Sequence, residues 1–168
     1  KKIGGSSSDY FNSVATSIEN NTVYIYAVGY EYSSTGSNDE AFITKWNTDG
    51  TLVWQKKIGG SNDDYFYSVT TSIENNTVYI YAVGYEYSST GNSNYEAFIT
   101  KWNTDGTLVW QKKIGGSNHD YFLSVTTSIE NNTVYIYAVG YEYSSTGNYE
   151  AFITKWNTDG TLVWQKKI

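Results

Sequence analysis

The chain of 168 residues contains no cysteine, no methionine, no proline and no arginine, and it has a single histidine. The missing cysteines exclude disulfide bridges and every cysteine-ligated metal centre. Seventeen acidic residues outnumber 11 lysines, so the net charge is −6. Without a basic stripe to neutralise phosphates, nucleic-acid binding is disfavoured. No apolar run approaches the roughly 18 residues of a membrane helix, so membrane insertion is not expected.

Aromatic residues are abundant, at 18% of the chain, which is too many for a disordered polypeptide. The dominant feature is an internal repeat. Lys-Lys-Ile recurs at 1–3, 56–58, 112–114 and 166–168. The repeats therefore span 1–55, 56–111 and 112–165, and residues 166–168 begin a further repeat. Near-identity of the units indicates recent duplication or deliberate design, and the start at Lys1 without methionine indicates a processed or trimmed product.

Each repeat has the texture of four antiparallel strands and no helix. In the first repeat the expected strands are Tyr10–Ile18, Thr22–Tyr32, Ala41–Asn47 and Thr51–Ile58. Asn20 and Asn21 are expected to form a two-residue turn, because asparagine tolerates positive φ. Both faces of the second strand are apolar, with Ile25 and Ala27 on one and Tyr26 and Val28 on the other. The second strand is therefore expected between two packed layers.

Four strands with a two-sided second strand are typical of a propeller blade. The segments Val-Tyr-Ile-Tyr-Ala-Val-Gly, Glu-Ala-Phe-Ile-Thr-Lys-Trp-Asn-Thr-Asp-Gly and Leu-Val-Trp follow Ile-Gly-Gly in each unit. This order resembles the SBBP-type beta-propeller repeat of secreted and surface proteins, most specifically at Glu40–Lys45, Glu96–Lys101 and Glu150–Lys155. The resemblance implies a propeller fold and an extracellular or cell-surface location. The chain departs from the family in having Glu19-Asn20-Asn21-Thr22 in place of an Asp-x-x-Gly-Asn turn.

Three blades cannot close a ring alone, because propellers contain about 4–8 blades. The sequence therefore predicts an all-β chain of three four-stranded antiparallel β-propeller blades that pairs with a second copy into a six-bladed homodimer. Nine blades from three chains are a rarer solution. A β-trefoil, which closes as a monomer, is the structural alternative. The surplus Lys-Lys-Ile at 166–168 suggests an excerpt from a longer tandem array.

The differences between repeats gather near the second-to-third loop and the connection between units, which lie at one end of a four-stranded meander. Loops on a rigid scaffold are where binding concentrates, although loops also drift without constraint. The candidate ligand-facing residues are Asp9, Asn12, Asn38, Asp39, Asp63, Asp64, Tyr67, Asn94, Tyr95, His119, Asp120, Asn148 and Tyr149.

Catalysis, a cofactor and a metal site are not expected. His119 occurs in one unit only, and each acidic position recurs once per blade, which is too far apart for the roughly 5–10 Å of a glycosidase pair. The repeated acids are better interpreted as turn and ladder partners, with Lys45, Lys101 and Lys155. The oxygen-rich segment Asn47–Thr51 favours a hairpin turn over a cation site.

The tryptophans favour core packing over sugar stacking. Asn20, Asn75 and Asn131 begin Asn-x-Thr sequons, candidate glycosylation sites or simple turns. We expect a non-enzymatic scaffold or interaction module on the cell surface or outside the cell. Its expected partners are a second copy and, beyond that, glycans or surface proteins. The alternatives are a carbohydrate-binding (lectin-like) propeller, an engineered or excerpted self-assembling repeat, and a filament or surface-layer subunit.

Overall fold

The computed structural model describes residues 8–32, 38–60, 62–88, 93–116 and 118–168. These residues form strands and turns and contain no helix, so none of them forms a helix that could cross a membrane. The first-repeat strands are β1 (Asp9–Glu19), β2 (Thr22–Tyr32), β3 (Asp39–Asn47) and β4 (Leu52–Ile58). The second-repeat strands are β5 (Asp64–Glu74), β6 (Thr77–Ser88), β7 (Asn94–Asn103) and β8 (Leu108–Ile114). The third-repeat strands are β9 (Asp120–Glu130), β10 (Thr133–Tyr143), β11 (Tyr149–Asn157) and β12 (Leu162–Lys167).

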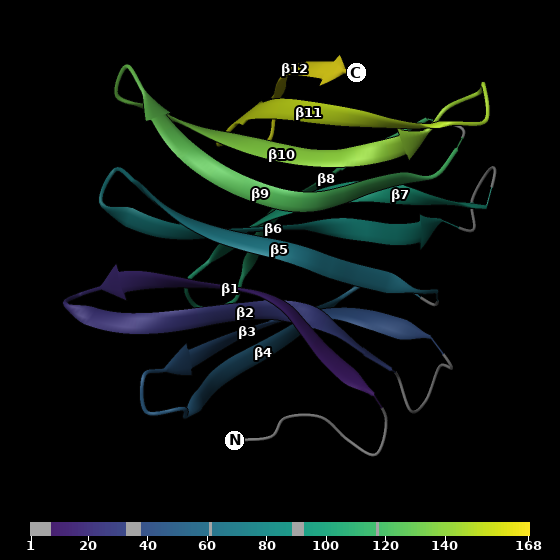
Figure 1. Cartoon of the computed structure of the whole chain (residues 1–168). Helices are drawn as coiled ribbons and strands as arrows, with labels where there is room; N and C mark the ends of the chain where they lie inside the picture. The colour runs from purple at the N-terminus through teal and green to yellow at the C-terminus, as the bar shows by residue number, and fades with distance from the viewer. Residues whose placement is uncertain (1–7, 33–37, 61, 89–92, 117) are drawn as a thin grey trace.

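Each repeat forms its own four-stranded antiparallel sheet, with the strands in chain order. This confirms the expected all-β fold and the three four-stranded units. The β-trefoil alternative is wrong, because a trefoil shares one barrel among its units, whereas the twelve described strands form three separate sheets, one in each repeat. Figure 1 shows the three sheets stacked face to face, with β1–β4 at one end, β5–β8 between, and β9–β12 at the other. The first strands β1, β5 and β9 lie next to one another.

The first hairpin of each sheet turns through two asparagines, as the sequence predicted. Asn20 and Asn21 have φ values of 47° and 63°, and the same pair recurs with nearly the same angles in the other sheets. Positive φ at both central residues gives a turn whose twist matches that of the flanking strands. Asparagine adopts this conformation at lower cost than most residues, and this fixes the register of β1 on β2.

A β-bulge interrupts the pairing of the first two strands in every sheet. In the first sheet, Phe11 pairs with Gly29 and Ser13 with Val28, so Asn12 is the extra residue. A Cβ on Gly29 would lie 1.7 Å from the carbonyl oxygen of Tyr10, so only glycine fits opposite the bulge. The bulged position is Tyr67 in the second sheet and Leu123 in the third.

Two apolar cores hold the stack together, one at each junction between neighbouring sheets. We use "junction" for such a face-to-face contact. The core of the first junction contains Tyr26, Val28, Ala41, Ile43, Phe66, Val69, Ile80, Ala82, Phe98 and Trp102. The core of the second contains Tyr81, Val83, Ala97, Ile99, Phe122, Val125, Ile136, Ala138, Phe152 and Trp156. Strand β6 therefore contributes to both cores from opposite faces, as expected for a second strand between two layers, whereas β2 and β10 each contribute to one core only.

Candidate functional site

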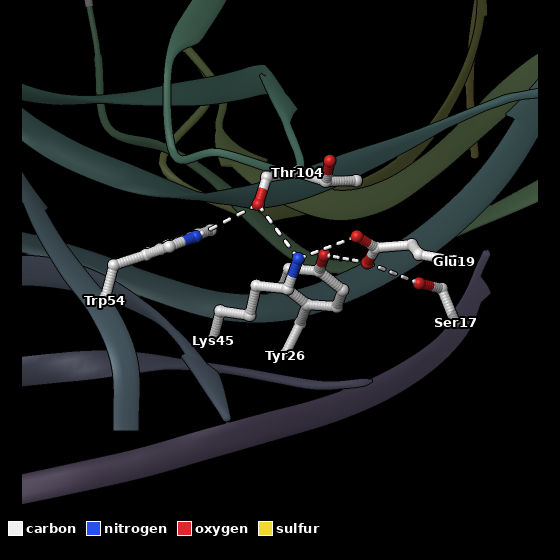
Figure 2. Close-up of polar contacts among 6 residues, drawn as sticks. All are labelled: Ser17, Glu19, Tyr26, Lys45, Trp54 and Thr104. Atoms are coloured by element: carbon white, nitrogen blue, oxygen red, sulfur yellow. Dashed lines mark hydrogen bonds and ion pairs between the residues drawn. The ribbon is translucent and has the colours of Figure 1, made fainter. Parts of the chain in front are cut away.

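A polar cluster accompanies the apolar core at the first junction (Figure 2). Lys45, on β3, places its Nζ 2.7 Å from a Glu19 carboxylate oxygen at the end of β1. The same Nζ donates to the Thr104 carbonyl, in the β7–β8 turn of the next sheet, over 3.1 Å. Trp54, on β4, donates its indole N–H to that same carbonyl over 3.0 Å. One backbone oxygen of the second sheet thus receives two donors from the first.

The second junction repeats this arrangement. Lys101 Nζ lies 2.7 Å from the Glu74 carboxylate and donates to the Thr158 carbonyl over 3.0 Å. Trp110 donates its indole N–H to the same carbonyl over 3.1 Å. We call this set, the lysine, its glutamate, the indole and the threonine carbonyl, the polar junction cluster. Its recurrence makes it a standard component of each junction.

The glutamate of the cluster is fully engaged. Glu19 accepts hydrogen bonds from the Tyr26 hydroxyl and from Ser17 Oγ, the latter over 3.0 Å, in addition to the Lys45 ion pair. Burial, with Glu19 beside it, raises the pKa of the Tyr26 hydroxyl, so the phenol stays protonated and donates. Lys45 Nζ also lies 3.9 Å from the centre of the Tyr24 ring. This confirms the interpretation of the repeated acids as structural partners of the lysines.

The candidate ligand-facing residues of the first junction join the two sheets to each other. Asn38 is buried and donates its side-chain amide to the Asn62 carbonyl over 2.9 Å. The Asp39 backbone N–H donates to the Asp63 carboxylate over 2.9 Å. The Tyr65 hydroxyl donates to the Asp39 carboxylate, also over 2.9 Å. The second-to-third loop of one sheet is therefore fastened to the connection that opens the next.

The second junction uses different side chains for the same contacts. Asn94 is buried and donates to the Asn118 carbonyl over 2.6 Å. The Tyr95 backbone N–H donates to His119 Nδ1 over 3.0 Å, and the two rings lie 5.5 Å apart. His119 thus takes the acceptor role that Asp63 has at the first junction. The differences between repeats at these positions distinguish one junction from the other.

Two further candidates are buried aspartates that hold the connection between repeats. Asp64 accepts the Gly60 backbone N–H, and Asp120 accepts that of Gly116, each over 2.9 Å. Burial raises the pKa of Asp64 to about 7 and raises that of Asp120 as well. Asp9 opens β1 at the same position and is half-buried.

The bulged positions also contribute contacts. Asn12 donates its side-chain amide to the Phe66 carbonyl of the next sheet over 2.7 Å. The Tyr67 hydroxyl lies 3.1 Å from that of Tyr85, and the two rings stack at 5.3 Å. Leu123, at the third bulge, is 40% exposed, and its side chain has no group that could form such a hydrogen bond.

A continuous row of tyrosines crosses all three sheets, a feature that sequence reasoning missed. Successive ring centres lie 4.6–5.0 Å apart. The row consists of Tyr10, Tyr30, Tyr65, Tyr85, Tyr121 and Tyr141. The signal in the sequence is one tyrosine near the start of the first strand and one near the end of the second in every repeat. Burial raises the pKa of Tyr121 to about 12, so this ring remains neutral.

Asn148 and Tyr149 stand apart from the other candidates because they lie outside the two junctions between the described sheets. Both are exposed, and Tyr149 is 67% exposed, with its ring edge against Tyr141 and Tyr143. A cavity of about 370 Å³ opens nearby and is lined by polar groups that include Asp120 and Lys167.

The remaining expectations concern turns, metals and glycans. The Thr51 backbone N–H donates to Asp49 over 2.8 Å, so Asn47–Thr51 is the hairpin turn that the sequence predicted. Within the described ranges, no three His, Asp or Glu side chains gather as a metal site. The sequon asparagines Asn20, Asn75 and Asn131 are exposed on their turns.

Comparison with known protein families and with curated proteins found no match. The likeness to SBBP-type repeats therefore rests on the quoted motifs and stays a prediction.

Proposed function

We propose that the chain is a non-enzymatic β-propeller repeat protein that acts as an extracellular or cell-surface scaffold or interaction module. In this proposal two chains close into a six-bladed homodimer. The observation that carries it is the use of the repeated polar side chains: those of the polar junction clusters and of the loops at the two junctions bind one sheet to the next. A chain whose recurring functional groups serve assembly is suited to presenting a surface rather than to catalysis.

The placement outside the cell rests on the SBBP-type motifs, on the Ser-, Thr-, Asn- and Tyr-rich composition, and on the three exposed sequons. The proposed ring closure is supported by the packing of the three sheets, which use equivalent faces at both junctions. Because a propeller contains about 4–8 blades, two chains of three sheets are enough to complete one.

Sedimentation velocity over a wide range of concentrations tests the ring. A single species of about twice 18.9 kDa, with a ring-shaped outline in electron micrographs, is the expected result. A single chain at every concentration contradicts the ring. Long, polydisperse assemblies support the filament or surface-layer alternative instead.

Carbohydrate binding is the second candidate function, and the exposed Tyr149 beside the polar cavity favours it. Exposed aromatic rings are platforms on which sugars stack. Binding to a glycan array that is lost in Tyr149→Ala supports this function. The matched control is Tyr95→Ala, the equivalent position in the second sheet, where the ring packs against Tyr85 and His119. An array without signal for the unaltered protein contradicts it.

A further inference from the structure

We propose that the exposed face of the last sheet binds the exposed face of the first sheet of a second copy, head to tail. We call the outer face of the first sheet the head face and the outer face of the last sheet the tail face. The inference rests on the proposed scaffold function and specifies the partner, the two surfaces and the atoms that join them.

The head face consists of residues whose counterparts are already packed inside the molecule. It comprises Phe11, Val14, Ile25, Ala27, Phe42 and Trp46, which correspond by position to the second-sheet half of the first core. Ala27 and Phe42 are already buried in the single chain, at 8% and 1% exposed, so Phe11 and Val14 carry most of the exposed apolar surface. Val14 is 64% exposed, whereas its counterparts Val69 and Val125 are 6% and 7% exposed. Phe11 is 49% exposed, whereas Phe66 is fully buried. The amino acids are identical, so the difference comes from the missing neighbour.

The tail face is the complementary half. It comprises Tyr135, Tyr137, Val139, Ala151, Ile153 and Trp164, which correspond to the first-sheet half of the same core. Val139 is 40% exposed, whereas Val28 and Val83 are fully buried. Ala151 is exposed, although the alanines at this position in the other sheets are fully buried. The tail face therefore has the shape and chemistry that already pack against a head-type face twice within the chain.

The polar junction cluster is divided between the same two faces. At the inner junctions Trp54 and Trp110 donate to the carbonyls of Thr104 and Thr158. Within the part of the chain that the structure describes, Trp164 has no such acceptor and the Thr48 carbonyl receives no indole donor. A head-to-tail contact would bring these two groups together.

The turn after Thr48 contains Gly50, and the space above this glycine is open where the equivalent glycines of the other sheets lie against a tryptophan ring. A Cβ on Gly106 would lie 3.2 Å from the Trp54 ring, and one on Gly160 would lie 3.2 Å from the Trp110 ring. At Gly50, the equivalent position of the first sheet, nothing lies within 4 Å. The Trp164 ring of a second copy fits the space above Gly50.

The ion pair of the last sheet is also incompletely covered. Glu130, the partner of Lys155, is 39% exposed, while its counterparts Glu19 and Glu74 are 13% and 12% exposed. Lys155 Nζ lies 2.6 Å from Glu130, and within the residues that the structure describes it donates to no threonine carbonyl of another sheet. In the proposed contact it donates to the Thr48 carbonyl of the second copy.

Because the head face and the tail face differ, the contact is heterologous, and it closes into a ring if the rotation per chain allows. At the rim of this contact Tyr149 faces the position of Ser8, where the inner junctions have Asp63 and His119 as acceptors. A serine hydroxyl is also an acceptor, so the backbone N–H of Tyr149 has a partner there.

Two surface variants and their mixture test the direction of the contact. Val14→Asp blocks the head face, and Ala151→Asp blocks the tail face; both sites are exposed in the single chain, so both variants should fold. Val53→Asp is the matched control, because Val53, Val109 and Val163 are 45–46% exposed in all three sheets and lie outside the junctions. We expect the unaltered protein and Val53→Asp to associate equally, and each blocked variant to associate at least tenfold more weakly.

The mixture is decisive. An equimolar mixture of the two blocked variants should form a two-chain particle, because each contributes one intact face, although neither variant associates alone. Association of either blocked variant alone, or failure of the mixture, overturns the head-to-tail contact while a dimeric unaltered protein still supports the ring. An unaltered protein that remains a single chain overturns both the ring and this inference.

A second pair of variants tests the indole hydrogen bond that is proposed at the contact. Trp164→Phe removes the indole donor at the proposed contact and should weaken association roughly 3- to 10-fold, the effect of one hydrogen bond, without changing the unfolding of the single chain. Trp54→Phe removes the same donor at an inner junction and should lower stability while leaving association unchanged. Equal effects of the two substitutions on association would overturn the assignment of Trp164 to this contact.

Discussion

Replacing Lys101 with methionine is expected to lower the free energy of unfolding by about 3–5 kcal/mol, since this removes one partner of a buried ion pair. Lys101 and Glu74 have side chains only 7% and 12% exposed, and their charged atoms lie 2.7 Å apart. Methionine keeps most of the length and the apolar stem. What it removes is the charge that compensates Glu74 and the donor to the Thr158 carbonyl.

The loss in the free energy of unfolding has two parts, and a second substitution separates them. Most of the loss is the cost of leaving the Glu74 carboxylate buried without a cation. The double variant Lys101→Met with Glu74→Gln removes that charge and keeps an acceptor for the Tyr81 hydroxyl. It should therefore recover more than half of the loss, leaving a deficit near the roughly 1 kcal/mol of a lost hydrogen bond.

Urea denaturation followed by tryptophan fluorescence measures the free energies of unfolding of the single and the double variant, at one fixed protein concentration. For a domain of this size, the single variant should melt roughly 6–20 °C below the unaltered protein. Lys45→Met, at the other inner junction, is the replicate and should give a similar loss. A loss below about 1 kcal/mol in both single variants, or losses that simply add in the double variant, would refute the reasoning.

Three further predictions concern single positions. Asp64→Asn should become more stable relative to the unaltered protein as the pH rises: the raised pKa of about 7 means that the stability given by neutral Asp64 is complete below about pH 4 and is lost as the pH passes 7. The relative gain between pH 4 and pH 8 is on the order of 4 kcal/mol, and urea titrations at the two pH values that give the same difference would contradict it. Gly84→Ala should lower the free energy of unfolding by at least about 3 kcal/mol, because the new Cβ would lie 1.7 Å from the Tyr65 carbonyl oxygen. A melting temperature equal to that of the unaltered protein would contradict this clash. Asn76→Ala should cost about 1–2 kcal/mol because of its φ of 63°, while Asn76→Gly should restore most of the loss; a calorimetric scan that ranks alanine above glycine would oppose the left-handed turn.

The strands could be predicted closely from local patterns. The second strand was expected at Thr22–Tyr32, which matches β2, and the asparagine pair has the positive φ that a two-residue hairpin requires. These features depend on period-two alternation and on single-residue conformational preference, both of which are local. The first and third strands extend one or two residues beyond the expected bounds, because pairing with β2 continues into flanking polar residues.

The role of the variable loop residues could not be predicted in the same way. From the sequence, Asp63 and His119 were predicted to be loop side chains that face a ligand. In the structure each accepts a backbone N–H from the preceding sheet. Their partners, Asp39 and Tyr95, are 24 residues away in the sequence, and no local pattern reports such a pairing. The β-bulge at Asn12 was missed for a related reason, since it is defined by the register between two strands.

The sequence by itself determined the repeat, the four-stranded units and the apolar character of both faces of the second strand, because these follow from spacing and from the alternation of side chains along a strand. Only the tertiary structure decided which face packs on which. It seats Trp54 over the turn at Gly106 and leaves the turn at Gly50 open, because packing between sheets depends on positions that are distant in the chain.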